Sequence, residues 1–257
     1  MKPVNHLNDE HALFWEMPNR APKIYYFETL DSTMDAALAM ARKGCESGTV
    51  VVAGRQTKGR GRMTRIWHSE KGGLYFTIVL RPEILLKYAA RVGFAASLSM
   101  AQTLNQLFGI SARVKWPNDL LIGHRKISGM LSQVEAQSDH ISFLNIGIGV
   151  NINNDPVESA PESVSVKALL NRVVSPQEVL FGFLNRLDTV MKDSNALEHI
   201  VDEWKKHTVT LGRTVKVVTS QGVHHGVARD VDASGALIIE LENGMLQPVL
   251  YGDCFHQ

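Results

Sequence analysis

The chain has 257 residues, of which 44% are apolar and 21% charged, which is enough for one large globular domain and a small one. A net charge of +1 argues against a protein that binds nucleic acid through its overall charge. Two cysteines, Cys45 and Cys254, cannot build a disulfide framework, and no apolar run reaches the length of a membrane span. We therefore expect a cytoplasmic protein.

The first 22 residues are predicted to form a short arm ahead of the first strand. They lack the apolar core and the small-residue cleavage site of a signal peptide, and they are too few for a helix-turn-helix domain. A strand is predicted at residues 23–27, and an alanine-rich helix at residues 36–42. Ser32 and Asp35 have the spacing of a helix-capping pair. Ser32 and Thr33 either cap this helix or present hydroxyl groups to a polar ligand, and the two interpretations are compatible.

A glycine-rich basic loop is predicted between two buried strands. Residues 49–53 and 74–80 are rich in β-branched and aromatic residues, as buried strands are. Residues 55–65 contain glycines at 59 and 61, no acidic residue, and five basic residues: Arg55, Lys58, Arg60, Arg62 and Arg65. Arginine matches the geometry of phosphates and carboxylates, and glycine lets a ligand come close to the backbone. The loop, which Trp67 closes, therefore indicates an anionic, nucleotide-like ligand.

The middle of the chain predicts a long helix followed by a β-meander. Residues 89–108 are dense in Ala, Leu, Ser and Met, which is typical of a buried helix. A short strand and a turn lead into a hairpin that pairs residues 120–122 with residues 126–128. In residues 143–153 small residues recur with a period of two, so we expect another group to pack closely against the glycines. We place this meander at the centre of a sheet.

Near residue 207 the composition changes from helical to short strands with turns, which predicts a small β-barrel. Helices are predicted before this point at residues 166–170, 176–191 and 196–206. The fold class is therefore α+β, a mixed β-sheet packed with helices plus the C-terminal barrel. The predicted units are an arm at 1–22, a ligand-binding catalytic domain at 23–207 and a C-terminal domain at 208–257.

The basic loop and residues 115–131 together suggest a reaction that joins a carboxylate to a nucleotide α-phosphate. Both reactants are anionic, so cations must neutralise their approach. Arg62 and Arg65 are candidates for clamping phosphates, Lys126 for holding the carboxylate–phosphate junction, and Asp119 for binding Mg²⁺. Taken singly, Lys126 is an ordinary edge lysine and Asp119 an ordinary turn residue. The GxxxxGK[ST] motif is absent, so the chain is not a P-loop enzyme.

Four motifs in matching order and spacing resemble those of the biotin protein ligases, the biotin–[acetyl-CoA-carboxylase] ligases. They are Gly59 to Trp67 followed by GGLYF at 72–76, KWPND at 115–119, KISGML at 126–131 and GIGVNIN at 147–153. The resemblance runs from about residue 23 to residue 253. It implies the catalytic fold of biotin and lipoate ligases, which is similar to that of class II synthetases, with an SH3-like C-terminal domain. It also implies the form of the family that has no N-terminal DNA-binding domain.

The resemblance implies a two-step reaction. Biotin and MgATP give biotinyl-5′-AMP and pyrophosphate, and the acyl group then moves to a lysine of a biotin carboxyl carrier protein. The positions that bind biotin in the family fall on Ser32, Thr33, Met34, Gln56, Gly59, Arg60, Gly61, Arg62, Lys126 and Gly129. Those that bind ATP or the adenylate fall on Arg62, Arg65, Trp67, Asn118, Lys126 and Asn151. Lys126, Arg62 and Arg65 would be catalytic, and Asp119 would hold Mg²⁺.

Three positions depart from the family's pattern. Met63-Thr64 stands where a basic residue followed by glycine is usual, so the loop is less cationic and less flexible at that point. Met34 stands where asparagine is common, which removes a possible polar contact. Gly252-Asp253 replaces the more usual Gly-Glu, a mild change.

Three other functions are alternatives to this one. Lipoate or octanoate ligases share the fold, but their arginine-glycine segment ending in His-Asp is absent, and neither cysteine lies where an acyl-accepting thiol is expected. A non-catalytic biotin-binding module is suggested by Met63-Thr64, although it would not need the phosphate-clamping cations. A nucleic-acid-binding protein is disfavoured by the net charge. We expect a monomer or homodimer that binds neither DNA nor membranes.

Overall fold

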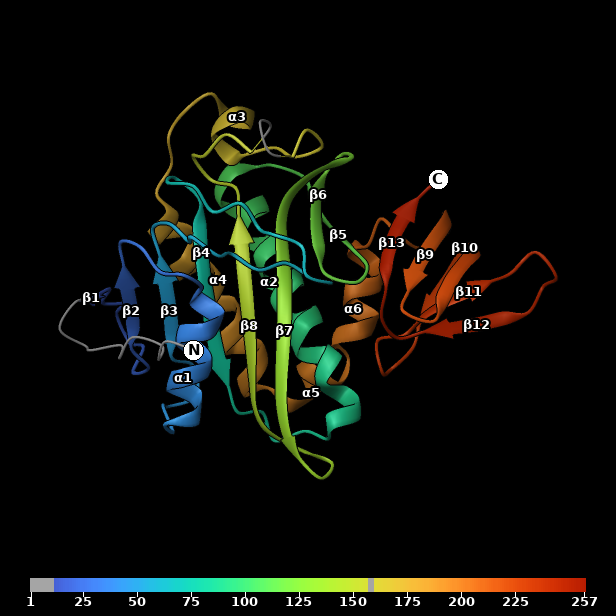
Figure 1. Cartoon of the computed structure of the whole chain (residues 1–257), viewed down its shortest axis with the longest axis horizontal. Coiled ribbons are helices and arrows are strands. Elements are labelled where there is room, and N and C mark those ends of the chain that lie inside the picture. The colour runs from blue at the N-terminus through green and yellow to red at the C-terminus, as the bar shows by residue number, and fades with distance from the viewer. Residues whose placement is uncertain (1–11, 157–159) are drawn as a thin grey trace.

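The computed structural model describes residues 12–156 and 160–257 (Figure 1). Residues 1–11 of the arm predicted at 1–22 therefore lie outside the described residues. Its last part contains a two-residue strand, β1 (Leu13–Phe14), which pairs antiparallel with β2 (Ile24–Phe27). The strand predicted at 23–27 is thus confirmed, but it is the second strand of the sheet and not the first.

An eight-stranded mixed sheet forms the centre of the larger unit, in the order β1-β2-β3-β4-β8-β7-β6-β5. Its β2–β3 pair is parallel and its other pairs are antiparallel. The remaining strands are β3 (Val50–Ala53), β4 (Leu74–Leu80), β5 (Ala112–Lys115), β6 (Asp119–Ile122), β7 (Arg125–Gln137) and β8 (His140–Val150). The meander β5–β8 is present, but it occupies one side of the sheet and ends it at β5, whereas we expected it at the centre.

Helices cover both faces of this sheet (Figure 1). On one face α1 (Thr33–Arg42) buries its alanines in a small apolar cluster with Val51, Val79 and Phe143. On the other face α2 (Ala89–Phe108), α4 (Pro176–Lys192) and α6 (Ile200–His207) enclose the main core. The remaining helical elements are η2 (Leu86–Tyr88), α3 (Val166–Leu170) and α5 (Ser194–Glu198). The single helix predicted at 196–206 is wrong in one respect, because the chain breaks it at His199 into α5 and α6.

The C-terminal unit is a five-stranded antiparallel sheet in the order β12-β11-β10-β9-β13. Its strands are β9 (Thr214–Thr219), β10 (Gly222–Val231), β11 (Leu237–Glu240), β12 (Leu246–Val249) and β13 (Asp253–His256). Buried Trp116 joins the two units, because its indole N–H donates to the Gly235 carbonyl at 3.0 Å and its backbone N–H donates to Thr210 Oγ1 at 3.0 Å. The α+β fold class is therefore confirmed. None of the helices in residues 12–156 and 160–257 is long and apolar enough to cross a membrane.

Candidate active site

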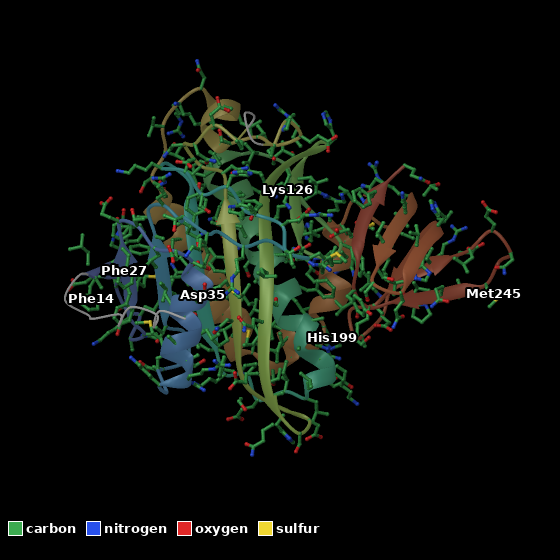
Figure 2. The ribbon with its side chains drawn as sticks, viewed as in Figure 1. Phe14, Phe27, Asp35, Lys126, His199 and Met245 are labelled. Atoms are coloured by element: carbon green, nitrogen blue, oxygen red, sulfur yellow. The ribbon has the colours of Figure 1, made fainter. Side chains whose placement is uncertain are left out.

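A pocket of about 130 Å³ lies where α1 begins, beside the glycine-containing parts of β7 and β8. The loop between β3 and β4 crosses in front of these two strands, and β13 of the C-terminal sheet contributes Asp253 (Figure 1). Figure 2 shows Lys126 near the upper end of β7 and Asp35 in the first turn of α1. The predicted site residues that line this pocket are Ser32, Thr33, Met34, Gln56, Arg60, Gly61, Arg62, Arg65, Trp67, Asn118, Asp119, Lys126 and Gly129.

Two predicted site residues do not line the pocket. Gly59 lies just behind it, where a Cβ would meet Ser69 Oγ at 2.6 Å and the Gln56 amide at 3.2 Å. Asn151 is buried, and its Oδ1 accepts a hydrogen bond from Asn154 Nδ2 at 3.0 Å. Both assignments stay predictions.

Seven lining residues are not among the site residues expected from the sequence: Ile66, Met130, Leu131, Gly147, Ile148, Gly149 and Asp253. Gly147 and Gly149 had carried only the expectation of a close packing partner, and that expectation is confirmed below. Asp253 was noted only as a mild departure from the family's pattern, and its contact with Arg65, 188 positions away, has no local signal in the sequence.

The basic loop is a β-hairpin. Arg60 and Ile66 pair as an antiparallel bridge, the Gly61 N–H donates to the Arg65 carbonyl at 2.8 Å, and the Arg65 N–H donates to the Arg62 carbonyl at 3.0 Å. The two turn residues between them, Met63 and Thr64, have φ values of 49° and 64°. Two successive positive φ values are what a type I′ hairpin turn requires. A β-branched residue is unfavourable in this region of φ, so Thr64 strains the turn.

A chain of hydrogen bonds orders the polar end of the pocket. Gln56 Oε1 accepts from the Thr33 N–H at 2.8 Å and from Thr33 Oγ1 at 3.1 Å, while Gln56 Nε2 donates to Ser69 Oγ at 2.8 Å. Thr77 Oγ1 on β4 donates to Thr33 Oγ1 at 2.9 Å. Ser32 is the N-cap residue of α1, but its side chain makes no capping bond, and its buried Oγ has no partner among the described residues. The predicted N-cap position of Ser32 is therefore confirmed, but the side-chain capping bond is not formed, and the hydroxyl remains for a ligand.

Most of the loop's cations are already neutralised by carboxylates from other segments. Lys58 pairs with Asp31 at 2.8 Å, Arg55 with Glu70 at 3.4 Å, Arg60 with Asp35, and Arg65 with Asp253. Arg62 is different. Its guanidinium donates to Asn118 Oδ1 at 3.2 Å, and the described residues give it no ion pair. Burial lowers the pKa of Arg62, although Asp253 and Asp119 oppose this shift. Arg62 is thus the cation of the loop that is left to meet an anion in the pocket.

Trp67 packs on a glycine floor. Gly129 and Gly149 are register partners on β7 and β8, and a Cβ at either position would collide with the Trp67 indole. The Lys126 ammonium lies 5.3 Å from the centre of the same ring. The indole N–H is buried and has no partner among the described residues. Because the pocket is small, a larger ligand must either displace the Trp67 ring or contact it. The unpaired indole N–H is then available to that ligand.

Asp119 is the one predicted metal ligand. Its Oδ1 lies 2.6 Å from Lys126 Nζ, but this buried oxygen has no aligned hydrogen bond among the described residues. A metal centre built from three or more His, Cys, Asp or Glu side chains is not found in the described parts of the chain. Mg²⁺ commonly uses one or two carboxylates and completes its coordination with water and substrate phosphates. Asp119 therefore fits Mg²⁺ that arrives with a nucleotide.

Comparisons with known proteins agree with this fold. Residues 26–153 match the biotin/lipoate A/B protein ligase family, and residues 210–257 match the biotin protein ligase C-terminal domain. Together the two matches define a biotin/lipoate-type ligase. The second match points to one branch of that class, the ligases with this C-terminal domain.

Similar proteins identify that branch. The chain is 31% identical over 231 residues to the bifunctional ligase/repressor BirA of Bacillus subtilis, covering 86% of this chain and 70% of that one. It is 32% identical over 222 residues to the biotin–[acetyl-CoA-carboxylase] ligase of Paracoccus denitrificans, covering 81% and 90%. The biotin protein ligase of Aquifex aeolicus in complex with biotin and ATP superposes with a TM-score of 0.74 at 28% identity, covering 91% and 98%. The chain belongs to the biotin protein ligase family.

Proposed function

We propose that the protein is an ATP-dependent ligase that activates biotin as biotinyl-5′-AMP and transfers it to a lysine of a biotin carrier protein, such as the carrier subunit of acetyl-CoA carboxylase. One observation carries the proposal: a single pocket holds polar anchors at one end and Lys126 with Arg62 at the other. A ligand with a polar, uncharged ring and a carboxylate tail matches that arrangement. Biotin has a ureido ring and a carboxylate tail.

The polar end of the pocket selects the ring. The ureido group has N–H donors and a carbonyl acceptor, which are costly to bury without partners. Ser32 Oγ is buried and has no partner among the described residues. The hydrogen bonds between Thr33 and Gln56 fix the positions of these two side chains. The dithiolane ring of lipoate and the alkyl chain of octanoate would leave the Ser32 hydroxyl unpaired. We therefore assign Ser32, Thr33 and Gln56 to the discrimination between biotin and other acyl substrates.

The cationic end promotes the first step. A biotin carboxylate oxygen attacks the α-phosphorus of ATP, a P–O bond forms, and the bond to the pyrophosphate breaks. Lys126 would lie at the carboxylate and Arg62 at the phosphate, where they offset the repulsion between two anions. Mg²⁺ held by Asp119 would neutralise charge on the phosphates. With Asp119 holding that cation, the Lys126 ammonium, which pairs with Asp119 in the structure, would be available to the substrate carboxylate.

In the second step the neutral ε-amine of the acceptor lysine attacks the acyl carbon. A C–N bond forms, the C–O bond to the phosphate breaks, AMP leaves, and the amine loses a proton. The hairpin that carries Arg62 lies over the pocket, so we assign it the retention of the adenylate until the carrier arrives. The two free cysteines accord with a reducing cytoplasm. Either a monomer or a homodimer is compatible with this scheme.

The test of this proposal is ATP-dependent acyl transfer to an isolated biotin carrier domain, with biotin, lipoate and octanoate supplied in parallel. We expect transfer of biotin alone, at the carrier's single acceptor lysine. Transfer of lipoate or octanoate in preference to biotin would overturn the substrate assignment. Binding of biotin without any transfer would favour a non-catalytic binding module.

A further inference from the structure

Asn145 on β8 is a buried polar residue that the proposed reaction does not use. Its exposed fraction is 0%, and neither Oδ1 nor Nδ2 has a hydrogen-bond partner among the described residues. Register places it between Val79 of β4 and Gln133 of β7, in the interior of the sheet. Native proteins leave few buried amides unpaired, because each missing hydrogen bond is costly. An amide with both ends unpaired therefore calls for a partner that enters later.

The side chain of Asn145 projects on the ligand side of the sheet. Alternate residues of a strand share a face, so Asn145 lies on the same face as Gly147 and Gly149, which both line the pocket. A Cβ at Gly147 would lie 2.6 Å from the Met34 sulfur and 3.5 Å from Thr77 Oγ1. Met34 thus occupies the space above Gly147 and forms the wall of the pocket on the side of Asn145.

Beyond this wall the layer above the sheet is built of small side chains. Ala37 and Ala41 of α1 pack in the cluster that contains Val79 and Phe143, the neighbours of Asn145 across and along the sheet. A second unpaired group, the buried Ser32 Oγ, lies on the pocket two residues before Met34. Ser32 thus lines the pocket, whereas Asn145 does not line it and lies behind the Met34 wall. Both are buried polar groups without partners among the described residues.

We propose that Asn145 is a specificity-determining residue whose amide hydrogen-bonds the ureido ring of biotin once the Met34 side chain has shifted. A carboxamide donates and accepts at the same time, and a cyclic urea does the same, whereas a dithiolane ring does neither. Methionine has an unbranched, flexible side chain, so this wall can move at little cost. The inference rests on the proposed function, because it takes the ureido ring as the group that fills this end of the pocket.

The experiment is calorimetric titration of biotin and of lipoate into the full-length protein and its Asn145→Val variant. We expect the Kd for biotin to rise about tenfold, which is the effect of one or two lost hydrogen bonds, and any weak binding of lipoate to stay unchanged. Valine removes an unpaired amide, so the ligand-free variant should melt at the wild-type temperature or above it. Thr103→Val is the matched control, since Thr103 is a buried polar residue of α2 on the other face of the sheet.

Two further outcomes separate the inference from the proposed function. If the wild-type protein does not bind biotin, the proposed function fails. If the wild type binds biotin and Asn145→Val binds it equally well, only the role of Asn145 fails. The double variant Met34→Asn/Asn145→Val moves the amide from β8 to the facing position on α1. Recovery of biotin affinity relative to Asn145→Val supports a direct contact with the ring, and a further loss would contradict it.

Discussion

Lys126 Nζ lies 2.6 Å from Asp119 Oδ1, so the ammonium assigned to the biotin carboxylate and the carboxylate assigned to Mg²⁺ are partners of each other in the ligand-free protein. The pair is half-buried, which makes loss of either member costly, and it keeps both groups in place before substrate binds. ATP that brings Mg²⁺ would replace the ammonium at Asp119. The ion pair would therefore couple nucleotide binding to the availability of Lys126.

Replacing Arg62 should weaken retention of the adenylate. Arg62 is the loop cation that has no ion pair among the described residues, and it is positioned by Asn118. We expect Arg62→Gly to release biotinyl-5′-AMP roughly tenfold faster and to label lysines of bystander proteins. Mass spectrometry of a mixture of carrier and albumin measures both effects. Arg172→Gly, at an exposed position, is the control, and labelling confined to the carrier would contradict the role of Arg62.

Arg65 and Asp253 join the hairpin to the C-terminal sheet, and the pair tests whether Arg65 clamps phosphate. If Arg65 leaves Asp253 to bind ATP, Arg65→Ala should raise the KM for ATP roughly fivefold, because a phosphate contact is lost. Asp253→Asn should lower that KM, since it frees the arginine in advance. Steady-state kinetics with varied ATP measure both values. A raised KM for ATP in both variants would show instead that the ion pair is structural and holds the hairpin against the C-terminal sheet.

The strain at Thr64 predicts a stabilising substitution. Glycine tolerates φ near 64° without the steric cost that a β-branched side chain has. We expect Thr64→Gly to slow hydrogen exchange at the Gly61 and Arg65 amides, both of which donate across the hairpin. Met63→Ala is the control, because it changes the other turn residue without introducing a glycine. Unchanged exchange at these two amides in Thr64→Gly would mean that the loop does not form this turn in solution.

The local sequence predicted those parts of the site that depend on nearby residues. Runs of β-branched residues located β3 and β4, and the small residues of β8 predicted the packing that Met34 and Trp67 provide. The sequence predicted the N-cap position of Ser32, but not that its side chain makes no capping bond, nor that Gln56, 23 positions away, accepts from the Thr33 N–H.

Contacts that join distant segments were beyond the reach of the local sequence. The Arg65–Asp253 pair spans 188 positions, and no spacing rule predicts it. The unpaired state of Asn145 likewise becomes visible only once the strands on either side of it are known.

His256 predicts a pH dependence of stability. It lies on β13, where Nε2 is 3.3 Å from Thr210 Oγ1, the acceptor of the Trp116 N–H. Burial, together with Lys115 and Arg213, lowers the pKa of His256 to about 4, whereas an unfolded chain has a histidine pKa of about 6.5. Between these values the unfolded state binds the proton and the folded state does not. Stability from this group is therefore complete above pH 6.5 and is lost as the pH falls towards 4.

Thermal unfolding of wild type and His256→Gln across that range measures this effect. We expect the wild-type melting temperature to fall by about 2–4 °C more than that of the variant between pH 6.5 and pH 4. Carboxylates titrate in both proteins, so the difference between the two curves isolates His256. Parallel curves would contradict the depressed pKa.

Biotin-dependent exchange of labelled pyrophosphate into ATP tests directly whether Lys126 and its neighbours form an acyl-adenylate from biotin and ATP. This exchange needs no carrier protein. We predict exchange in the wild type and in Lys192→Ala, whose lysine is exposed on α4, and a loss of roughly 100-fold or more in Lys126→Ala. Because that variant leaves Asp119 without its partner, Lys126→Gln and the melting temperatures of both variants exclude unfolding as the cause. Exchange near the wild-type rate in the folded Lys126 variants, or exchange that does not require biotin, would contradict the account.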